Sequence, residues 1–150
     1  MGEKLTKLQG WESNLHSFLS ESKNKKFGWG DWDCALFADG AIQKMAGESA
    51  LDGLEWHDKR SAIKAIRENG TFLDAVINRL EKAGLERIEN KHCEKGDIVI
   101  YKAYFRHIQG LENNALGVYE GYNIAGPSEV GMVRTKPTNL VRVYRLNESR

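Results

Sequence analysis

The amino-acid sequence predicts one α+β domain, spanning residues 1–150, in which helices come first and a curved antiparallel sheet follows. Apolar residues repeat at one-turn spacing as far as about Gly84. From about Lys95 onward, short β-branched and aromatic runs alternate with glycine and asparagine turns. No helical segment separates these runs, which favours antiparallel neighbours over parallel βαβ units.

The composition sets the outer bounds on function. A chain of 150 residues with 41% hydrophobic and 29% charged residues is typical of one globular domain. Its 22 basic and 21 acidic residues are interspersed, so nothing indicates a nucleic-acid partner. Neither a secretory signal nor a run of about 18 apolar residues occurs, so we expect no membrane insertion and a cytoplasmic location.

Four helices are predicted in the first half of the chain. The first spans about 11–20, where the apolar residues fall on one face. The second contains Cys34 in its first turn, with Asp33 as its N-cap and Gly47 as its stop. The third spans about 58–70, and the fourth begins at about residue 71 and ends at Gly84.

Four strands are predicted in the second half. They are the runs DIVIYKAY, ALGVYEG, EVGMVRT and NLVRVYRL, at residues 97–104, 115–121, 129–135 and 139–146.

Cys34 is the first candidate for chemistry, because it follows a turn rich in glycine and tryptophan and opens a helix. Unpaired N–H groups at a helix start favour the thiolate. Asp31 and Asp33 oppose it by adding negative charge. A free cysteine also serves often as a small buried hydrophobe, and the apolar neighbours of Cys34 suit that role. The sequence leaves both interpretations open.

Two tryptophans in the same turn are candidates for ligand binding. Trp29 and Trp32, with Asp33, are placed to line a groove for a carbohydrate or a peptide. Large aromatics near a helix start also commonly fill the core. The other cysteine, Cys93, adjoins His92, but no second pair of ligands stands at zinc-site spacing. We therefore expect two reduced cysteines, no metal and no cofactor.

The segment Trp29-Gly30-Asp31-Trp32-Asp33-Cys34 resembles the nucleophile motif of NlpC-type papain-like cell-wall cysteine peptidases. Two strands extend the resemblance, at GDIVI (96–100) and LGVYEG (116–121). FGWG followed by DCALFADGAI is similar, more closely, to a phage-encoded NlpC-like family found beside tail genes. The resemblance covers about 11–146 and implies a papain-like NlpC-type fold.

One departure from the resemblance bears on activity. The catalytic histidine of these peptidases begins the second of the two strands, and the residue at that position is Ala115. The third polar residue, expected from the strand after the turn, has no counterpart in Asn123-Ile124-Ala125. A cysteine peptidase needs an imidazole near its sulfur to accept and return a proton. The resemblance therefore implies a catalytically degenerate domain.

Another histidine could serve as the base. His107 precedes Ala115 by eight positions in a predicted loop and is the best candidate, while His57 follows the Cys34 helix. A lone histidine in a soluble domain is more often structural.

Two functions remain open. The first is a structural or assembly component of a phage or prophage tail tip, with other tail-tip or hub proteins as partners. It would be present in the host cytoplasm during assembly and in the virion afterwards. The second is a thiol amidase that cleaves peptidoglycan stem peptides. There Cys34 is the nucleophile, His107 the base, and N–H groups near Cys34 stabilise the oxyanion.

Overall fold

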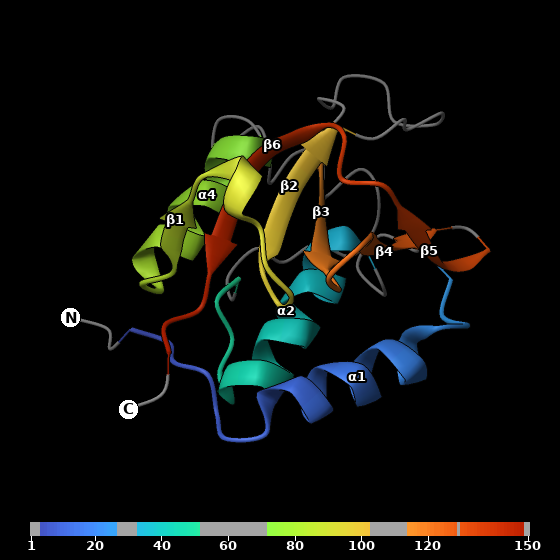
Figure 1. Cartoon of the computed structure of the whole chain (residues 1–150), viewed down its shortest axis with the longest axis horizontal. Coiled ribbons are helices and arrows are strands. Elements are labelled where there is room, and N and C mark those ends of the chain that lie inside the picture. The colour runs from blue at the N-terminus through green and yellow to red at the C-terminus, as the bar shows by residue number, and fades with distance from the viewer. Residues whose placement is uncertain (1–3, 27–32, 52–71, 103–113, 129, 149–150) are drawn as a thin grey trace.

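The structure is a computed structural model that describes residues 4–26, 33–51, 72–102, 114–128 and 130–148. In these ranges the chain forms the helices α1 (Trp11–Ser22), α2 (Cys34–Ala46) and α4 (Phe72–Lys82). A six-stranded antiparallel sheet packs against them (Figure 1). The α+β class and the antiparallel sheet predicted from the sequence are confirmed.

The helix boundaries lie close to the predicted ones, because local capping signals set them. α2 begins at Cys34, and the Asp33 carboxylate accepts the Leu36 N–H at 2.9 Å. It ends at Gly47, whose φ of 83° lies in the left-handed region that suits glycine. α1 runs to Ser22, two residues past the predicted end. The predicted helix at 58–70 lies outside the described residues.

The sheet contains a meander and one returning strand. The strands are β1 (Glu86–Ile88), β2 (Ile98–Lys102), β3 (Asn114–Tyr119), β4 (Ile124–Ser128), β5 (Gly131–Thr135) and β6 (Leu140–Arg145). Their order in the sheet is β1-β6-β2-β3-β4-β5. β2 to β5 therefore form an antiparallel meander, while β6 returns to pair with the other edge of β2. The 3₁₀ turn η1 (Asn90–His92) lies in the connection between β1 and β2.

Two strands were not predicted, and β4 shows why. Its sequence contains Gly126 and Pro127, which strands usually disfavour. Pro127 stands opposite Met132, whose N–H donates away from β4 to the Lys23 carbonyl at 3.0 Å. The missing N–H of proline therefore removes no bond from this ladder. The other unpredicted strand, β1, has only three residues and no alternating pattern.

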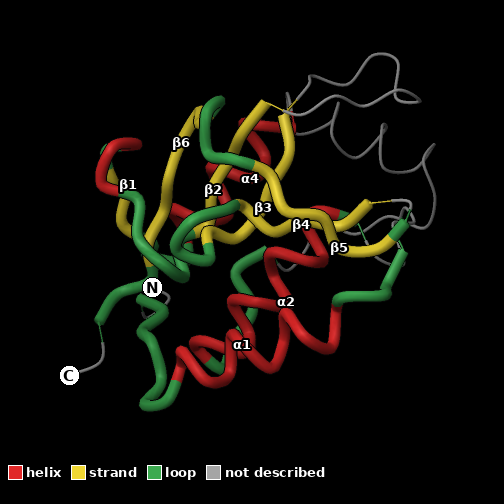
Figure 2. The backbone as a smooth tube through the Cα atoms, turned by 45° about the vertical axis from the view of Figure 1, so that its right-hand side comes forward, coloured by secondary structure: helices red, strands yellow, loops and turns green. Residues whose placement is uncertain are grey.

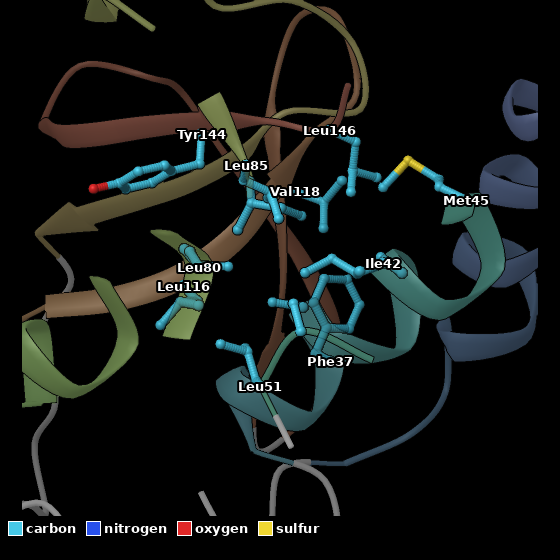
Figure 3. Close-up of a cluster of buried hydrophobic side chains, with 14 of the residues drawn as sticks. Phe37, Ile42, Met45, Leu51, Leu80, Leu85, Leu116, Val118, Tyr144 and Leu146 are labelled. Carbon is cyan, nitrogen blue, oxygen red and sulfur yellow. The ribbon is translucent and has the colours of Figure 1, made fainter. Parts of the chain in front are cut away.

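The core lies between the helices and one face of the sheet. α2 contributes Phe37, Ile42 and Met45, which point toward side chains of β3 and β6 (Figure 3). Phe37 also packs on Phe18 of α1, with ring centroids 5.4 Å apart. α4 adds Val76 and Leu80 to the same cluster. This packing fixes α2 against the sheet and so determines where its first residue lies.

The two ends of the described chain are joined. Thr6 and Asn147 form a parallel bridge, and the N- and C-terminal segments lie close together in Figures 1 and 2. The Asn147 side-chain amide also donates to the carbonyls of Leu5 at 3.0 Å and Gly84 at 2.8 Å. Among the helices described, none is long and apolar enough to span a membrane.

Candidate functional site

Cys34 lies where the start of α2 meets β3. Its sulfur is hydrogen-bonded by the backbone N–H of Leu116, and by the N–H groups of Cys34 and Ala35 at the helix start. β3 and β4 pair at Val118↔Ala125 and Tyr119↔Ile124. Leu116 lies beyond the last of these pairs, which leaves room for the cysteine to approach β3 from the helix side.

The Cys34 thiol is buried and held in its neutral form. Only 5% of the residue is exposed. Burial raises the pKa of the thiol from 9.0 to about 12, and the nearby charge of Asp33 raises it further, whereas the three backbone N–H groups lower it by less. The N–H groups at the helix start do stabilise a thiolate, but burial and the charge of Asp33 have the larger, opposite effect on the pKa. At neutral pH Cys34 is therefore a protonated thiol without solvent access.

Asp33 is the N-cap of α2. The residue is fully buried, and its carboxylate caps α2 through the Leu36 N–H. The cap prediction is confirmed, while the groove that Asp33 was expected to line with two tryptophans stays a prediction. Trp29 and Trp32 lie outside the described residues.

Tyr101 of β2 lies across the sheet from the position where the sequence resemblance expects a histidine. It stands directly opposite Ala115 of β3, so both side chains share the sheet face that lies away from the helices. Burial raises the pKa of the Tyr101 phenol, and proximity to Cys34 raises it further. Tyr101 is therefore uncharged at neutral pH, as Cys34 is.

Two glycines make room for the Tyr101 ring. A Cβ atom at Gly117 would lie 3.1 Å from Cε1 of Tyr101 and 2.8 Å from the Ala125 carbonyl oxygen. A Cβ atom at Gly126 would lie 3.0 Å from the Tyr101 hydroxyl oxygen. The ring thus extends from β2 across β3 to β4 over positions without side chains. This close approach explains why glycine stands in the Leu-Gly-Val triplet of β3.

The described histidines do not supply a base. His16 is exposed on α1, and His92 is exposed on η1, where its Nε2 lies 3.8 Å from a Glu89 carboxylate oxygen. His107 and His57 lie outside the described residues. The structure therefore brings together Cys34, Asp33 and the backbone of Leu116, and it pairs Ala115 with Tyr101, which sequence reasoning did not single out. A tyrosine in an apolar strand carries no sign of its neighbour across the sheet.

Cys93 lies near the charged side chains of Glu94, Asp97 and Arg145. Burial raises its pKa to about 12, and Asp97 contributes to the rise. Both cysteines are free, as predicted. Across the parts of the chain that the structure describes, no three His, Cys, Asp or Glu side chains gather as metal ligands.

The raised thiol pKa values imply a loss of stability at alkaline pH. Below pH 9 the Cys34 thiol is protonated in both the folded and the unfolded state. Between pH 9 and about 12 only the unfolded state releases the proton, so the free energy of unfolding falls as pH rises. We expect Cys34 to contribute a loss on the order of 2–3 kcal/mol at pH 11.

Urea titrations of wild type and Cys34→Ala at several pH values measure this contribution. The stability difference between the two proteins is expected to be constant below pH 9 and to shrink above it. A difference that stays constant to pH 11 would show that the folded-state pKa is not raised.

Residues 6–146 match the model of a family described as a domain of unknown function, DUF6950. The match includes every helix and strand described above. The search of curated proteins found no match.

Proposed function

The chain belongs to the DUF6950 family, a domain of unknown function, and we propose that it is a catalytically inactive, papain-like NlpC-type domain. In this role it serves as a structural or assembly component of a phage or prophage tail tip. Its partners there are other tail-tip or hub proteins, and it passes from the host cytoplasm into the virion.

The burial and protonation of the Cys34 thiol are the main support for the proposal that the domain is inactive. A nucleophilic cysteine must be at least partly ionised and open to its substrate. The Cys34 thiol is 5% exposed, and burial raises its pKa to about 12. The thiolate fraction at neutral pH is therefore very small, and the buried residue presents little surface to a substrate. These features support a structural use of the segment.

The residues across the sheet support the same interpretation. Ala115 stands where the resembling peptidases carry their histidine, and it is buried opposite Tyr101. Alanine can neither accept the thiol proton nor donate one to a leaving amine. The assignment to a phage tail has a different basis, which is the similarity of FGWG and DCALFADGAI to a phage-encoded family found beside tail genes.

The alternative function is a thiol amidase acting on peptidoglycan stem peptides, and one observation favours it. Three backbone N–H groups already point at the Cys34 sulfur, and such donors stabilise a thiolate. For activity, His107 would have to approach the sulfur and the sulfur would have to become accessible to the substrate. Cys34 would then attack the amide carbonyl, and the protonated imidazole would return its proton to the leaving amine.

Incubation with purified sacculi distinguishes the two functions. We expect the wild-type protein to release no new amino termini, and Cys34→Ala to give the same result. A muramyl endopeptidase serves as the positive control for the substrate. Release by the wild type that is lost in Cys34→Ala would establish the amidase.

The tail assignment has its own test. Particles induced from a strain that encodes this chain are purified on a density gradient and analysed by mass spectrometry. We expect the chain to co-purify with the tail proteins in a constant ratio across the particle fractions. Its absence from intact particles would contradict a virion role without reviving the amidase.

A further inference from the structure

We propose that the outer edge of β5 (Gly131–Thr135) is a docking site for an extended, acidic peptide segment of a partner protein, which adds a strand to the sheet there. β5 is the last strand in the sheet order, and Figure 1 shows it at the right-hand end of the sheet. The proposal goes beyond the proposed function, because it concerns an edge of the sheet and not the Cys34 site. It holds for either of the two functions considered above.

The β4–β5 register shows which backbone groups of β5 point away from the sheet. Met132 stands opposite Pro127, and its N–H donates to the Lys23 carbonyl at 3.0 Å instead of to β4. Antiparallel ladders alternate between hydrogen-bonded and non-hydrogen-bonded pairs, so Arg134, two residues on, also directs its N–H and carbonyl outward. Among the described residues, none forms a backbone hydrogen bond with these two outward groups. The backbone of Arg134 is therefore open to an added strand.

The length and regularity of β5 suit strand addition. Proteins commonly blunt an exposed edge with a very short strand, a bulge, a proline or a covering loop. β5 has five residues, contains no proline and pairs with β4 without a register shift. β1, at the opposite edge of the sheet, has only three residues. In the described part of the chain, the segment around Lys23 meets the β5 edge at Gly131 and Met132 and leaves Arg134 uncovered.

Basic side chains flank the open position and indicate the charge of the partner. The carbonyl of Lys23 meets one end of β5, and Lys136 directly follows the other end. Both lysines are exposed, and neither forms an ion pair with a described acidic side chain. Arg134 lies between them, and its Nε binds Oε2 of Glu120 at 2.7 Å. These charges disfavour the pairing of two copies of this edge, and the same charges attract an acidic strand.

NMR titration of the ¹⁵N-labelled protein with an acidic peptide tests the proposal. The probe is an acetylated hexapeptide of alternating glutamate and valine, and its charge-reversed counterpart carries lysine in place of glutamate. We expect the acidic peptide to shift the amide signals of Met132, Val133 and Arg134. The basic peptide is expected to bind on the order of tenfold more weakly. No binding of the acidic peptide, or equal binding of both peptides, would overturn the proposal.

Arg134→Pro separates strand addition from simple attraction between charges. It removes the outward N–H and no hydrogen bond to β4, at a kind of position where strands tolerate proline. We expect it to bind the acidic peptide on the order of tenfold more weakly than Arg134→Ala, which keeps the N–H. If Arg134→Pro does not fold, a fully N-methylated acidic peptide is titrated into the wild-type protein, with the same loss expected. Unchanged binding in either experiment would contradict strand addition.

Charge reversal at the edge has a matched control. Lys136→Glu is expected to weaken binding of the acidic peptide roughly threefold or more. Lys91→Glu changes an exposed lysine on η1, which follows β1, and is expected to bind like the wild type. Equal weakening in both variants would overturn the proposal, because it would show attraction to the net charge alone. A dimer of the free protein that is lost in Arg134→Pro, measured by sedimentation velocity, would also overturn it by identifying a second copy as the occupant.

Discussion

Replacing Asp97 by alanine is expected to lower the free energy of unfolding by about 3–5 kcal/mol. The Asp97 carboxylate is fully buried and binds the Arg145 guanidinium through two contacts, Nε to Oδ1 at 2.8 Å and Nη2 to Oδ2 at 2.9 Å. It also accepts the Glu94 N–H at 2.8 Å. Removal of the carboxylate leaves a cation and an amide without their partner, and such losses are large where water cannot replace it.

The loss of stability in Asp97→Ala is expected toward the lower end of this range of free energies, because 19% of the Arg145 side chain is exposed and can be hydrated. Thermal unfolding by circular dichroism is expected to show a midpoint about 6–12 °C lower. The double variant Asp97→Ala with Arg145→Met removes both charges and is expected to lose less than the single variant. Glu89→Ala breaks only exposed ion pairs, so a change below about 0.5 kcal/mol is expected there. Equal losses in Glu89→Ala and Asp97→Ala would contradict this account.

Replacing Asp39 by alanine is expected to lower the free energy of unfolding by about 3–4 kcal/mol. Asp39 lies on the buried side of α2, and its carboxylate accepts four hydrogen bonds. Two come from the backbone N–H groups of Ala50 and Leu51, at 2.8 and 3.0 Å. These amides are buried and would be left unsatisfied, at about 1–3 kcal/mol each. The carboxylate thus holds the turn after α2 against the helix.

Asp39→Asn tests the assignment, because the amide oxygen can still accept both backbone N–H groups. A loss of about 1–2 kcal/mol is expected for this variant by urea denaturation. Glu48→Ala, an exposed acid two residues after the helix, is the control and is expected to change stability by less than about 0.5 kcal/mol. If Asp39→Asn were as destabilised as Asp39→Ala, the charge rather than the acceptor geometry would be the stabilising feature.

Local signals made much of the fold predictable. The Asp33 cap and the Gly47 stop define α2 without tertiary information, and one-turn apolar spacing locates α1. β4 escaped prediction because Gly126 and Pro127 are tolerated there for tertiary reasons, namely the approach of Tyr101 and the position opposite Met132. The insertion of β6 between β1 and β2 depends on long-range pairing that no local pattern encodes.

The candidate site was predictable only in part. The sequence placed Cys34 at a helix start, but the balance between the helix N–H groups and burial depends on what covers the sulfur. The pairing of Tyr101 with Ala115 follows from register alone. Asp39 did give a signal, since a carboxylate among the apolar residues of a buried helix face needs partners. The partner of Asp97, in contrast, lies on a strand 48 residues away.

The central claim is that Cys34 is a closed, neutral thiol in the folded protein. The most direct test is the pH profile of its alkylation by iodoacetamide in the Cys93→Ser protein, with urea-unfolded protein as the reference. We expect the folded protein to react far more slowly than the reference at neutral pH, and its rate to rise only toward pH 12. A rapid plateau near neutral pH that disappears in His107→Ala would contradict the account and identify a working cysteine–histidine pair.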